Sequence, residues 1–490
     1  MHSTCETVEQ NQRKLAAEIV EGRHLTKRNT QQQNSHQTQC WNSDEQTALL
    51  RIRQTARKDK STRFTSLIHH ITTDRLRDCF FKIKKQAAPG IDKVTWSMYE
   101  QNLEFNLQDL HKRTQSGGYR AQPSRRTFIP KPNGEKRPLG IATLEDKVLQ
   151  RAMVEVLNAI YEEDFLGFSY GFRPKRSAHQ ALDALAVGIR ARKISWIIDA
   201  DIRRFFDSMN HDWLMKFLEH RIADKRVLRL IKKWLKAGVM ESGKFVDSEN
   251  GVPQGAPISP LLSNIYLHYV LDLWVNQWRD KRAHGDVIVV RFADDFIIGL
   301  QDGCDAALLR KQIEARFSKF SLTIHPEKSK VLRFGRFAKR DVRRYDGRRK
   351  PETFTFLGFT HCCATNRNGK FKVIRKTQRS RMRDKLKVIK TEMRRRMHQP
   401  VVMQGKWLRA VVQGYMNYHA IPDNIATIAA FKTQISHLWY KSLKRRSQRN
   451  RLDWFKMTKL VRLWLPREQI LHPWPERRFE VMTQGRSPVQ

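Results

Sequence analysis

An acidic dipeptide between two apolar half-strands is the feature that most constrains how this chain can fold. Residues 287–292 read VIVVRF and residues 296–299 read FIIG, and Asp294 and Asp295 lie between these two runs. This pattern predicts a β-hairpin whose tip carries both carboxylates. Because burying an unpaired carboxylate costs several kcal/mol, acids in such a place need cations.

A second strand-like segment supplies further acids. Residues 196–198 are apolar, and the strand period of two puts Asp199 and Asp201 on one face. Acids from separate strands that meet at one point suit hard divalent ions with oxygen ligands. Two such ions about 3.5–4 Å apart would activate a hydroxyl and stabilise a leaving phosphate oxygen, which is the chemistry of nucleotidyl transfer. The alternative is that each aspartate caps a strand end or pairs with a nearby arginine such as Arg291.

The net charge indicates the kind of partner that such a protein would bind. The 490 residues include 93 Lys and Arg against 49 Asp and Glu, a formal net charge of +44, while 40% of the residues are hydrophobic. A folded protein with so basic a surface favours a polyanion. No segment has the apolar composition of a membrane span, and residues 1–22 lack an apolar signal core. We therefore expect no membrane association and a location in the cytoplasm of a bacterium, close to the nucleoid.

The segment 129–140 is a candidate for holding phosphate. It predicts a hairpin that turns at Asn133-Gly134. Lys131 and Arg137 on its shoulders could clamp a triphosphate, because several cations on one hairpin can grip phosphate oxygens together. Taken by itself, the segment is better explained as a solvated basic turn.

A loop rich in Pro and Gly, residues 251–258, leads into a helix. The apolar spacing that follows predicts a long amphipathic helix with Ser259 as its N-cap and Pro260 at the first helical position. The N-terminal end of such a helix can hold phosphate or sugar groups. A plain loop entering a core helix is the alternative, but Gln254 among small residues favours a ligand contact.

One short segment combines aromatic side chains with cations. Tyr170 stands close to Arg173, Lys175 and Arg176, which suggests a platform where a single nucleic-acid strand stacks and makes backbone contacts. We therefore predict RNA-binding roles for these three cations. His179 is better explained as a structural residue, because the metal mechanism needs no histidine.

After Phe359 strands are no longer recognisable, and basic helical patterns dominate. Between residues 375 and 396 acids are few, and the cations are expected to form a nucleic-acid track whose binding weakens steeply with salt. A solvated helix face is the alternative. The predicted RNA-binding cations of this track are Arg381, Arg383, Lys387, Arg394 and Arg395. Farther on, residues 407–418 place an apolar stripe on one helical face, which predicts core packing.

Taken in order, the motifs resemble those of a group II intron reverse transcriptase, also called an intron-encoded maturase. The matching segments are PGIDKVT (89–95), IPKPNGEKRPLGIATLEDKVLQRA (129–152), SYGFRPKRSAHQAL (169–182), DADIRRFFD (199–207), GVPQGAPISPLLSNIYLH (251–268), RFADDF (291–296) and FTFLGF (354–359). The resemblance implies an α+β fold, a right-hand polymerase of fingers and palm with an α-helical thumb or maturase domain. It divides the chain into a polar N-terminal extension (1–60), fingers and palm (61–360), thumb or maturase helices (361–455) and a basic C-terminal tail that could contact DNA (456–490).

The resemblance also assigns the metal site. Asp201, Asp294 and Asp295 match the catalytic acids of the palm, which would hold two Mg²⁺ ions, and the main-chain carbonyl of Ile202 would complete the metal shell. One departure lies next to these acids, where Phe292 stands in place of the usual tyrosine. It removes one polar contact and no acid, so we expect polymerisation to persist.

Four further residues match the nucleotide site of the family. Phe206 matches the residue under the incoming sugar that rejects a 2′-hydroxyl. Lys131 and Arg137 match the triphosphate-binding fingers, and Gln254 matches the loop beside the nucleotide. The implied substrates are deoxynucleoside triphosphates. The implied partners are a DNA primer and target and the group II intron RNA, whose splicing and retrohoming the protein would promote. The oligomeric state stays open, a dimer included.

Two other functions stay open. A splicing-only RNA-binding protein could use an inactive polymerase scaffold. However, three acids without cations would not help such a protein to bind RNA. Another bacterial reverse transcriptase, such as a retron or CRISPR-associated enzyme, is disfavoured by the long helical stretch after FTFLGF. The six cysteines include no C-x-x-C pair, so the zinc-dependent HNH endonuclease module of some relatives is expected to be absent.

Overall fold

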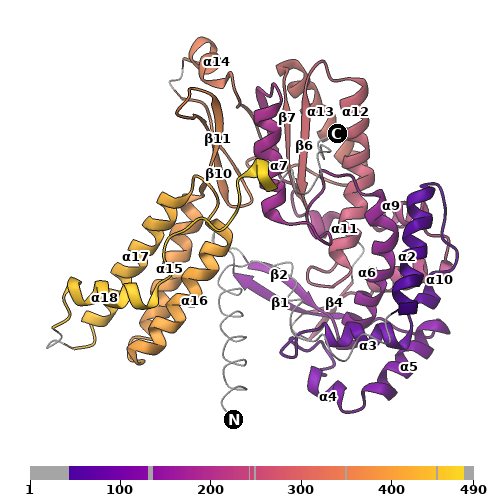
Figure 1. The fold of residues 1–490 in the computed structure, drawn as a ribbon. Coiled ribbons are helices and arrows are strands. Elements are labelled where there is room, and N and C mark those ends of the chain that lie inside the picture. Colours follow the sequence, from indigo (N-terminus) through magenta and orange to yellow (C-terminus); the bar gives the residue numbers. More distant parts are fainter. Residues whose placement is uncertain are drawn as a thin grey trace.

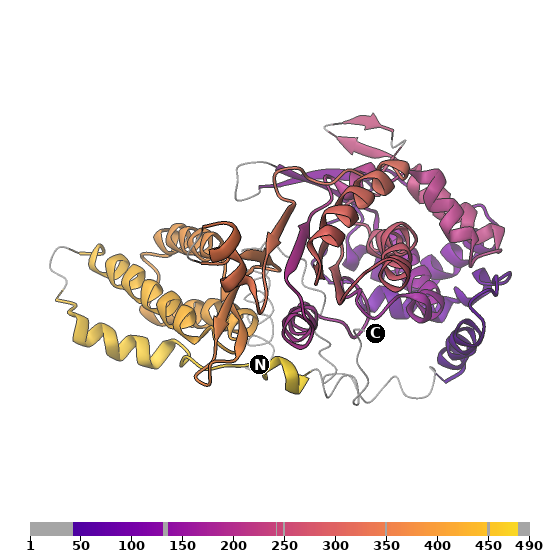
Figure 2. The same cartoon turned by 90° about the horizontal axis from the view of Figure 1, so that it is seen from above.

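The computed structural model describes residues 43–130, 136–241, 243–247, 250–347, 350–447 and 451–478. Within these residues the chain forms three small sheets and the helices around them, with a group of helices near the C-terminus set to one side of the rest (Figures 1 and 2). The predicted α+β fold with a helical C-terminal part is confirmed. None of the described helices is long and apolar enough to cross a bilayer.

The first part of the chain is helical and packs around α6. Its elements are α2 (Ser43–Lys58), η1 (Ile68–His70), α3 (Thr73–Phe81), α4 (Trp96–Glu100), α5 (Leu103–Gln115) and α6 (Leu144–Asp164). Helix α2 buries Ile52 and Ala56 in the main core, and Arg53 lies 3.4 Å from Glu163 at the end of α6. Residues 43–58 are thus part of the folded body and not of a loose extension, while residues 1–42 lie outside the described residues.

A hairpin sheet follows, with strand order β2-β1-β4-β5. Its strands are β1 (Ser124–Pro130), β2 (Lys136–Ile141), β4 (Val239–Glu241) and β5 (Lys244–Val246). The predicted hairpin is confirmed, because Ile129 pairs with Arg137 and Pro130 with Lys136 in antiparallel register. The predicted turn at Asn133-Gly134 lies outside the described residues.

The central sheet has the order β6-β7-β3-β8 and is antiparallel throughout. Its strands are β3 (Trp196–Ala200), β6 (Val287–Phe292), β7 (Asp295–Leu300) and β8 (Lys330–Arg333). Alternate residues enter two different cores: Ile288 and Val290 face helix α7 (Ala178–Ala191), whereas Val289 faces the main core, which α13 (Gly303–Lys319) also enters. Both strand predictions are confirmed, and the sheet is buried on both faces.

The remaining helices before the third sheet pack largely against one another. They are α8 (Phe205–Ser208), α9 (His211–Glu219), α10 (Lys225–Leu235), α11 (Ser259–Leu267), η2 (His268–Asp272) and α12 (Leu273–Lys281). The predicted long helix is present, but its middle turn, η2, is a π-helix. The prediction of Ser259 as N-cap is wrong: Ile258 is the N-cap, and the Ser259 hydroxyl instead donates to the Pro253 carbonyl at 2.9 Å.

A third sheet follows α14 (Ala338–Tyr345). It consists of β9 (Phe354–Phe356), β10 (Phe359–Thr365) and β11 (Phe371–Thr377), with β10 in the centre. The expectation that strands end at Phe359 is therefore wrong, and the predicted boundary between residues 360 and 361 falls inside β10. Phe354, Phe359 and Val373 share a core with α7, so this sheet packs against the central body.

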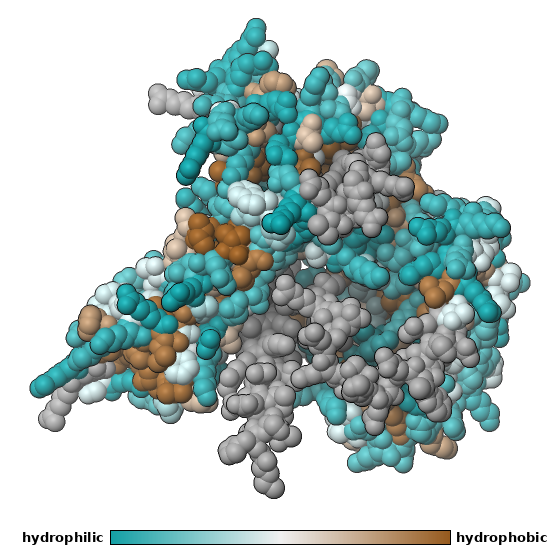
Figure 3. All heavy atoms as spheres, viewed as in Figure 1, coloured by the Kyte–Doolittle hydropathy of each residue, from teal (hydrophilic) through white to brown (hydrophobic). Residues whose placement is uncertain are grey.

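Four helices form what we call the helical module: α15 (Arg379–Arg395), α16 (Val401–His419), α17 (Ile425–Lys444) and α18 (Trp454–Trp464). They enclose a core of their own, in which Trp407, Val411, Tyr415 and Trp439 are buried. The predicted apolar stripe of α16 is thereby confirmed as core. Helix α18 contributes Met457 to this core, so the first part of the predicted tail is a packed helix. The space-filling view is mostly hydrophilic, with hydrophobic patches over the helical module (Figure 3).

Candidate active site

The hairpin of β6 and β7 presents both tip aspartates. Phe292 pairs with Asp295, which leaves Ala293 and Asp294 as the two turn residues. Ala293 has a φ of 58°, a backbone conformation that side chains other than glycine rarely adopt, so the surrounding structure must hold this turn in place. Gly171 helps to do so, because its backbone lies directly against Ala293 and leaves no room for a Cβ atom.

Arg291 holds this hairpin from behind. Its side chain is 0% exposed and donates to both carboxylate oxygens of Asp272, at 2.7 and 2.6 Å. It also donates to Asn264, to Ser169 and, at 3.1 Å, to the carbonyl of Ala293 in the turn. Arg291 is therefore fully engaged with Asp272 and does not neutralise the tip aspartates, which removes the alternative that those acids merely pair with it.

Asp201 follows β3, the strand beside β7. Its carbonyl accepts from the His325 N–H at 2.8 Å, and the Arg203 N–H donates to the Thr323 carbonyl at the same distance. These two hydrogen bonds lie on either side of Ile202, so Ile202 and Ile324 are a non-hydrogen-bonded pair of the antiparallel bridge. In this antiparallel pattern the Ile202 carbonyl points away from the partner segment and is available to a ligand.

The carboxylates of this site raise one another's pKa. Burial and then the nearby Asp201 raise the pKa of Asp294, while burial and then Asp294 raise that of Asp295. Burial and Asp201 also raise the pKa of Asp199 to about 7. Asp295 is nevertheless exposed to solvent over part of its surface. Asp201, Asp294 and Asp295 therefore lie near enough to influence one another's charge, and such a cluster of negative charge attracts cations.

One cation at this site could not be anticipated. The ammonium of Lys328 lies 3.2 Å from the Asp201 carboxylate, and its charge also favours the ionised form of Asp294. Within the described part of the chain, no group of three His, Cys, Asp or Glu side chains is placed so that it could hold a metal ion. The site therefore combines crowded acids with the ammonium of Lys328 and is not a preformed metal-binding site.

The predicted nucleotide residues lie next to these acids. Arg137 donates to the Gln254 side-chain carbonyl at 3.2 Å, and the Gln254 amide donates to Asp207 at 3.1 Å. Asp207 follows Phe206 on α8, and Gly251 lies so close that a Cβ there would stand 2.7 Å from the Phe206 carbonyl. Gln254 thus joins the hairpin sheet to α8. Lys131 lies outside the described residues.

Comparisons with known proteins relate part of this chain to a known family. Residues 129–361 match the family described as reverse transcriptase (RNA-dependent DNA polymerase). These residues form a reverse transcriptase domain. Protein YkfC of Escherichia coli is 39% identical over 241 residues, which is 43% of this chain and 62% of YkfC. The group II intron-encoded protein LtrA of Lactococcus lactis is 40% identical over 192 residues, 39% of this chain and 31% of LtrA.

The chain thus spans less than two thirds of the length of both relatives. A solved structure of telomerase from Candida albicans with a fragment of telomeric RNA aligns with a TM-score of 0.39 and 13% identity, covering 80% of this chain and 67% of that one. The reverse transcriptase match begins near the end of β1 and ends within β10, so β2, the three acids and the central sheet all lie inside it.

The aromatic segment of the reverse transcriptase domain is not the predicted RNA platform. Arg173 is buried: it donates to both oxygens of Glu162 and to two main-chain carbonyls, so an RNA contact at Arg173 is wrong. Tyr170 is also buried, under the guanidinium of Arg176 at 5.3 Å, which excludes base stacking on its ring. Lys175 alone among the three cations is exposed.

His179 has the structural role predicted for it. Its ring stacks on His472 at 3.9 Å and its Nε2 lies 2.8 Å from the Tyr418 carbonyl of α16. It therefore joins the reverse transcriptase domain to the helical module. Burial lowers the pKa of His179 to about 3, so the ring is neutral at physiological pH.

The predicted cations of α15 lie on the surface of the helical module. All five are exposed: Arg381, Arg383, Lys387, Arg394 and Arg395. Two of them have acidic partners on the same helix: Lys387 lies 3.9 Å from Asp384, and Arg395 lies 3.0 Å from Glu392. The charge of Arg381 also favours the ionised form of Asp295, so the start of α15 faces the acids of the reverse transcriptase domain.

Proposed function

We propose that the chain is the RNA-directed DNA polymerase of a mobile group II intron. It would synthesise cDNA by two-metal nucleotidyl transfer and would bind the intron RNA to promote splicing and retrohoming. The observation that carries the polymerase part is the convergence of Asp201, Asp294 and Asp295 beside the Arg137–Gln254 contact. The name of LtrA, a group II intron-encoded protein, supports the intron part.

Two Mg²⁺ ions would bind at this site together with the substrate. Magnesium is usually held by one or two carboxylates together with substrate phosphates, and this explains why the protein side chains form no complete cage. Asp201, Asp294 and Asp295 would hold the ions, with the Ile202 carbonyl as a further ligand. Bound there, the ions would activate the primer 3′-hydroxyl and stabilise the leaving pyrophosphate. Lys328 would release Asp201 when the ions and the triphosphate enter.

The neighbouring residues would position the incoming deoxynucleotide. Arg137 and Lys131 would bind the triphosphate, and the half-buried ring of Phe206 would lie under the sugar and reject a 2′-hydroxyl. Gln254 would fix the loop against α8, because it already bridges Arg137 and Asp207. The template RNA and the DNA primer would occupy the space between these residues and the helical module.

The intron RNA would bind the exposed basic face of α15. Arginine and lysine side chains that release counterions from RNA give strong and salt-sensitive binding without fixed geometry. The exposed cations of α15 and the formal net charge of +44 support this role. The rest of the predicted C-terminal tail beyond residue 478, with its DNA contact, lies outside the described residues.

The polymerase proposal is tested with the variant Asp294→Asn, which keeps the shape of the side chain and removes its charge. Extension of a DNA primer on an RNA template should fall by about 10³-fold or more. Affinity for intron RNA should stay within about twofold, because the acid is not an RNA ligand. Asp280→Asn on α12, at an exposed carboxylate, is the matched control. Near-normal cDNA synthesis by the Asp294 variant would refute the proposed role of the acids.

The intron part needs a separate test. The chain should bind the RNA of its flanking group II intron more tightly than an unrelated RNA of equal length, and this difference should persist in high salt, because only specific contacts survive screening. Splicing of the intron in low magnesium should then depend on the protein. Equal affinity for both RNAs together with active cDNA synthesis would favour another class of reverse transcriptase.

A further inference from the structure

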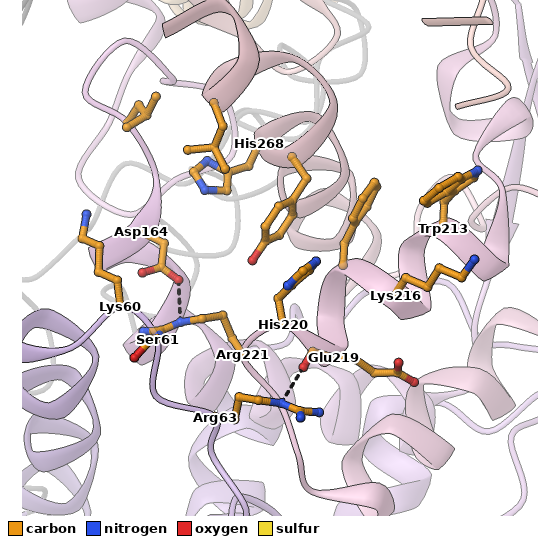
Figure 4. A pocket seen from close by; sticks show the side chains of 14 residues that line it. Lys60, Ser61, Arg63, Asp164, Trp213, Lys216, Glu219, His220, Arg221 and His268 are labelled. Carbon is orange, nitrogen blue, oxygen red and sulfur yellow. Dashed lines mark hydrogen bonds and ion pairs between the residues drawn. The ribbon is translucent and has the colours of Figure 1, made fainter. Parts of the chain in front are cut away.

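A hollow of about 880 Å³ lies apart from the candidate active site. The segment after α2, the end of α6, helix α9 and the π-helix η2 surround it, and Figure 4 shows the side chains that line it. It contains none of the acids or nucleotide residues described above. The proposed function therefore leaves this hollow unexplained.

The floor of the hollow is aromatic. The ring of Tyr269 stacks on Phe217 at 5.1 Å with an interplanar angle of 14°, and His220 also stacks on Tyr269, at 5.2 Å and 22°. His220 is exposed, so this stack of three rings ends at solvent. Leu273, 42% exposed, adds an aliphatic wall. A flat aromatic group can stack on such a surface whatever its chemical identity.

The rim of the hollow is cationic. Lys60, Arg63 and Lys216 line it and are all exposed. Arg63 is held in place by donation to the Glu219 carbonyl at 3.0 Å, and Lys216 lies 4.7 Å from the ring centre of Trp213 (Figure 4). Cations around an aromatic floor are complementary to a group that carries both a flat ring and a negative charge.

Several buried polar atoms at the hollow have no hydrogen-bond partner, among them one on Asp164 and one on His268. Asp164 is 8% exposed, and its Oδ1 accepts no hydrogen bond, although its other oxygen lies 2.9 Å from Arg221. His268 is 3% exposed, and its Nδ1 is likewise without a hydrogen bond. Both side chains line the hollow (Figure 4). Because an unsatisfied buried acceptor is costly, a donor on a ligand would be favoured here.

The floor also belongs to an unusual backbone segment. His268 and Tyr269 lie in the π-helix η2, and such π-bulges occur frequently at functional sites. The last residue of η2 is Asp272, whose carboxylate holds Arg291 and thereby the catalytic hairpin. The hollow and the hairpin thus share one structural element.

We propose that this hollow binds a nucleotide, that is, an aromatic base that carries a phosphate, either free or within a single-stranded RNA. The base would lie on the stack of His220 and Tyr269, the phosphate would meet Lys60 and Lys216, and a donor on the base edge would reach Asp164. The RNA form of this proposal rests on the proposed function, because it assumes that the chain holds RNA.

The test is photocrosslinking of the full chain to a single-stranded RNA that contains 4-thiouridine, with the attachment sites mapped by mass spectrometry. We expect crosslinks in residues 213–220 or 268–273. Leu273→Trp, which fills the hollow, and Lys216→Glu, which reverses a rim charge, should each lower their yield by at least about fivefold, because stacking and a phosphate contact are lost. Leu308→Trp and Lys311→Glu on α13, at exposed positions, are the matched controls and should stay within about twofold.

Competition distinguishes the two sources of the nucleotide. If millimolar uridine monophosphate removes these crosslinks, a free nucleotide occupies the hollow; if only single-stranded RNA does so, the nucleotide belongs to a strand. Absence of crosslinks in both segments, or an unchanged yield in both variants, overturns the proposal. Primer extension on a short template is measured in the same samples, so that failure of the polymerase proposal is seen separately from failure of this site.

Discussion

The central sheet and the helical module use charge in opposite ways. In the sheet, acids are crowded where β3 ends and β6 turns into β7. The buried pair of Arg291 and Asp272 fixes the backbone of that turn. In the module, the predicted cations of α15 lie on an exposed helix face, and Lys387 and Arg395 pair with acids of the same helix. Metal chemistry requires a few fixed oxygen atoms, whereas RNA binding requires only a density of positive charge. The first region should therefore be intolerant of single changes, and the second should respond in proportion to the number of cations removed.

The largest expected effect tests the rigid region. Arg291→Ala would leave Asp272 as an uncompensated buried charge, so the free energy of unfolding should fall by about 3–5 kcal/mol, measured by urea denaturation. Arg282→Ala, at an exposed cation, should change it by less than about 0.5 kcal/mol. The double variant Arg291→Met with Asp272→Leu should recover much of the loss, because it removes both charges. An equal loss of unfolding free energy in the Arg282 variant would mean that the buried ion pair matters no more than an exposed cation.

The same contrast explains what could be predicted from the sequence. The strands around Asp201, Asp294 and Asp295 were predictable, because each acid follows or interrupts a short apolar run. Lys328 was not, because it reaches Asp201 only through the pairing of β8 with β3. A contact between residues so far apart in the chain leaves no local pattern.

Cations were harder to assign than acids. Arg173 and Lys175 stand two residues apart in the same basic segment, yet the first is buried against Glu162 and the second is exposed. The difference depends on how the end of α6 packs, which the spacing of residues does not contain. Strand β11 was missed because Val373 is the one apolar residue among its three buried positions, and the other two are Arg375 and Thr377.

The second prediction tests the helical module, which should tolerate single changes. Arg383→Ala with Lys387→Ala removes two exposed cations from one face of α15. Affinity for intron RNA should fall by about tenfold at moderate salt, and the slope of log affinity against log salt should decrease by roughly two. Lys339→Ala with Arg343→Ala on α14 has the same spacing and exposure and should have a smaller effect. A larger loss without a change of slope would mean that these cations make fixed contacts, as the acids do.

The third prediction concerns the junction between the two regions. Asp183 on α7 lies 2.6 Å from Arg375 of β11 and 3.2 Å from Arg478, near the end of the described chain. Arg478→Ala should release the last segment, and cleavage of that segment by trypsin should be faster by about tenfold, as expected for a loss of ~1.4 kcal/mol. Arg477→Ala, at the exposed neighbouring position, is the control. Equal cleavage of both variants would show that the junction does not depend on this ion pair.

The smallest expected effect is a pH dependence of the melting temperature that comes from the acids at the end of β3 in the central sheet. The pKa of Asp199 is raised to about 7 by burial and by Asp201, so the folded chain binds this proton more tightly than the unfolded chain does. The stability that results is present below pH 4 and is lost as the pH rises through 7. In EDTA, the melting temperature should therefore fall by a few degrees between pH 5 and pH 8, and Asp199→Asn should make this slope shallower. Added Mg²⁺ should also reduce it, because a cation beside the acids favours their ionised forms. If Asp199→Asn left the slope unchanged while Lys311→Ala altered it, the acids would not be crowded, and the contrast between the two regions would lose its physical basis.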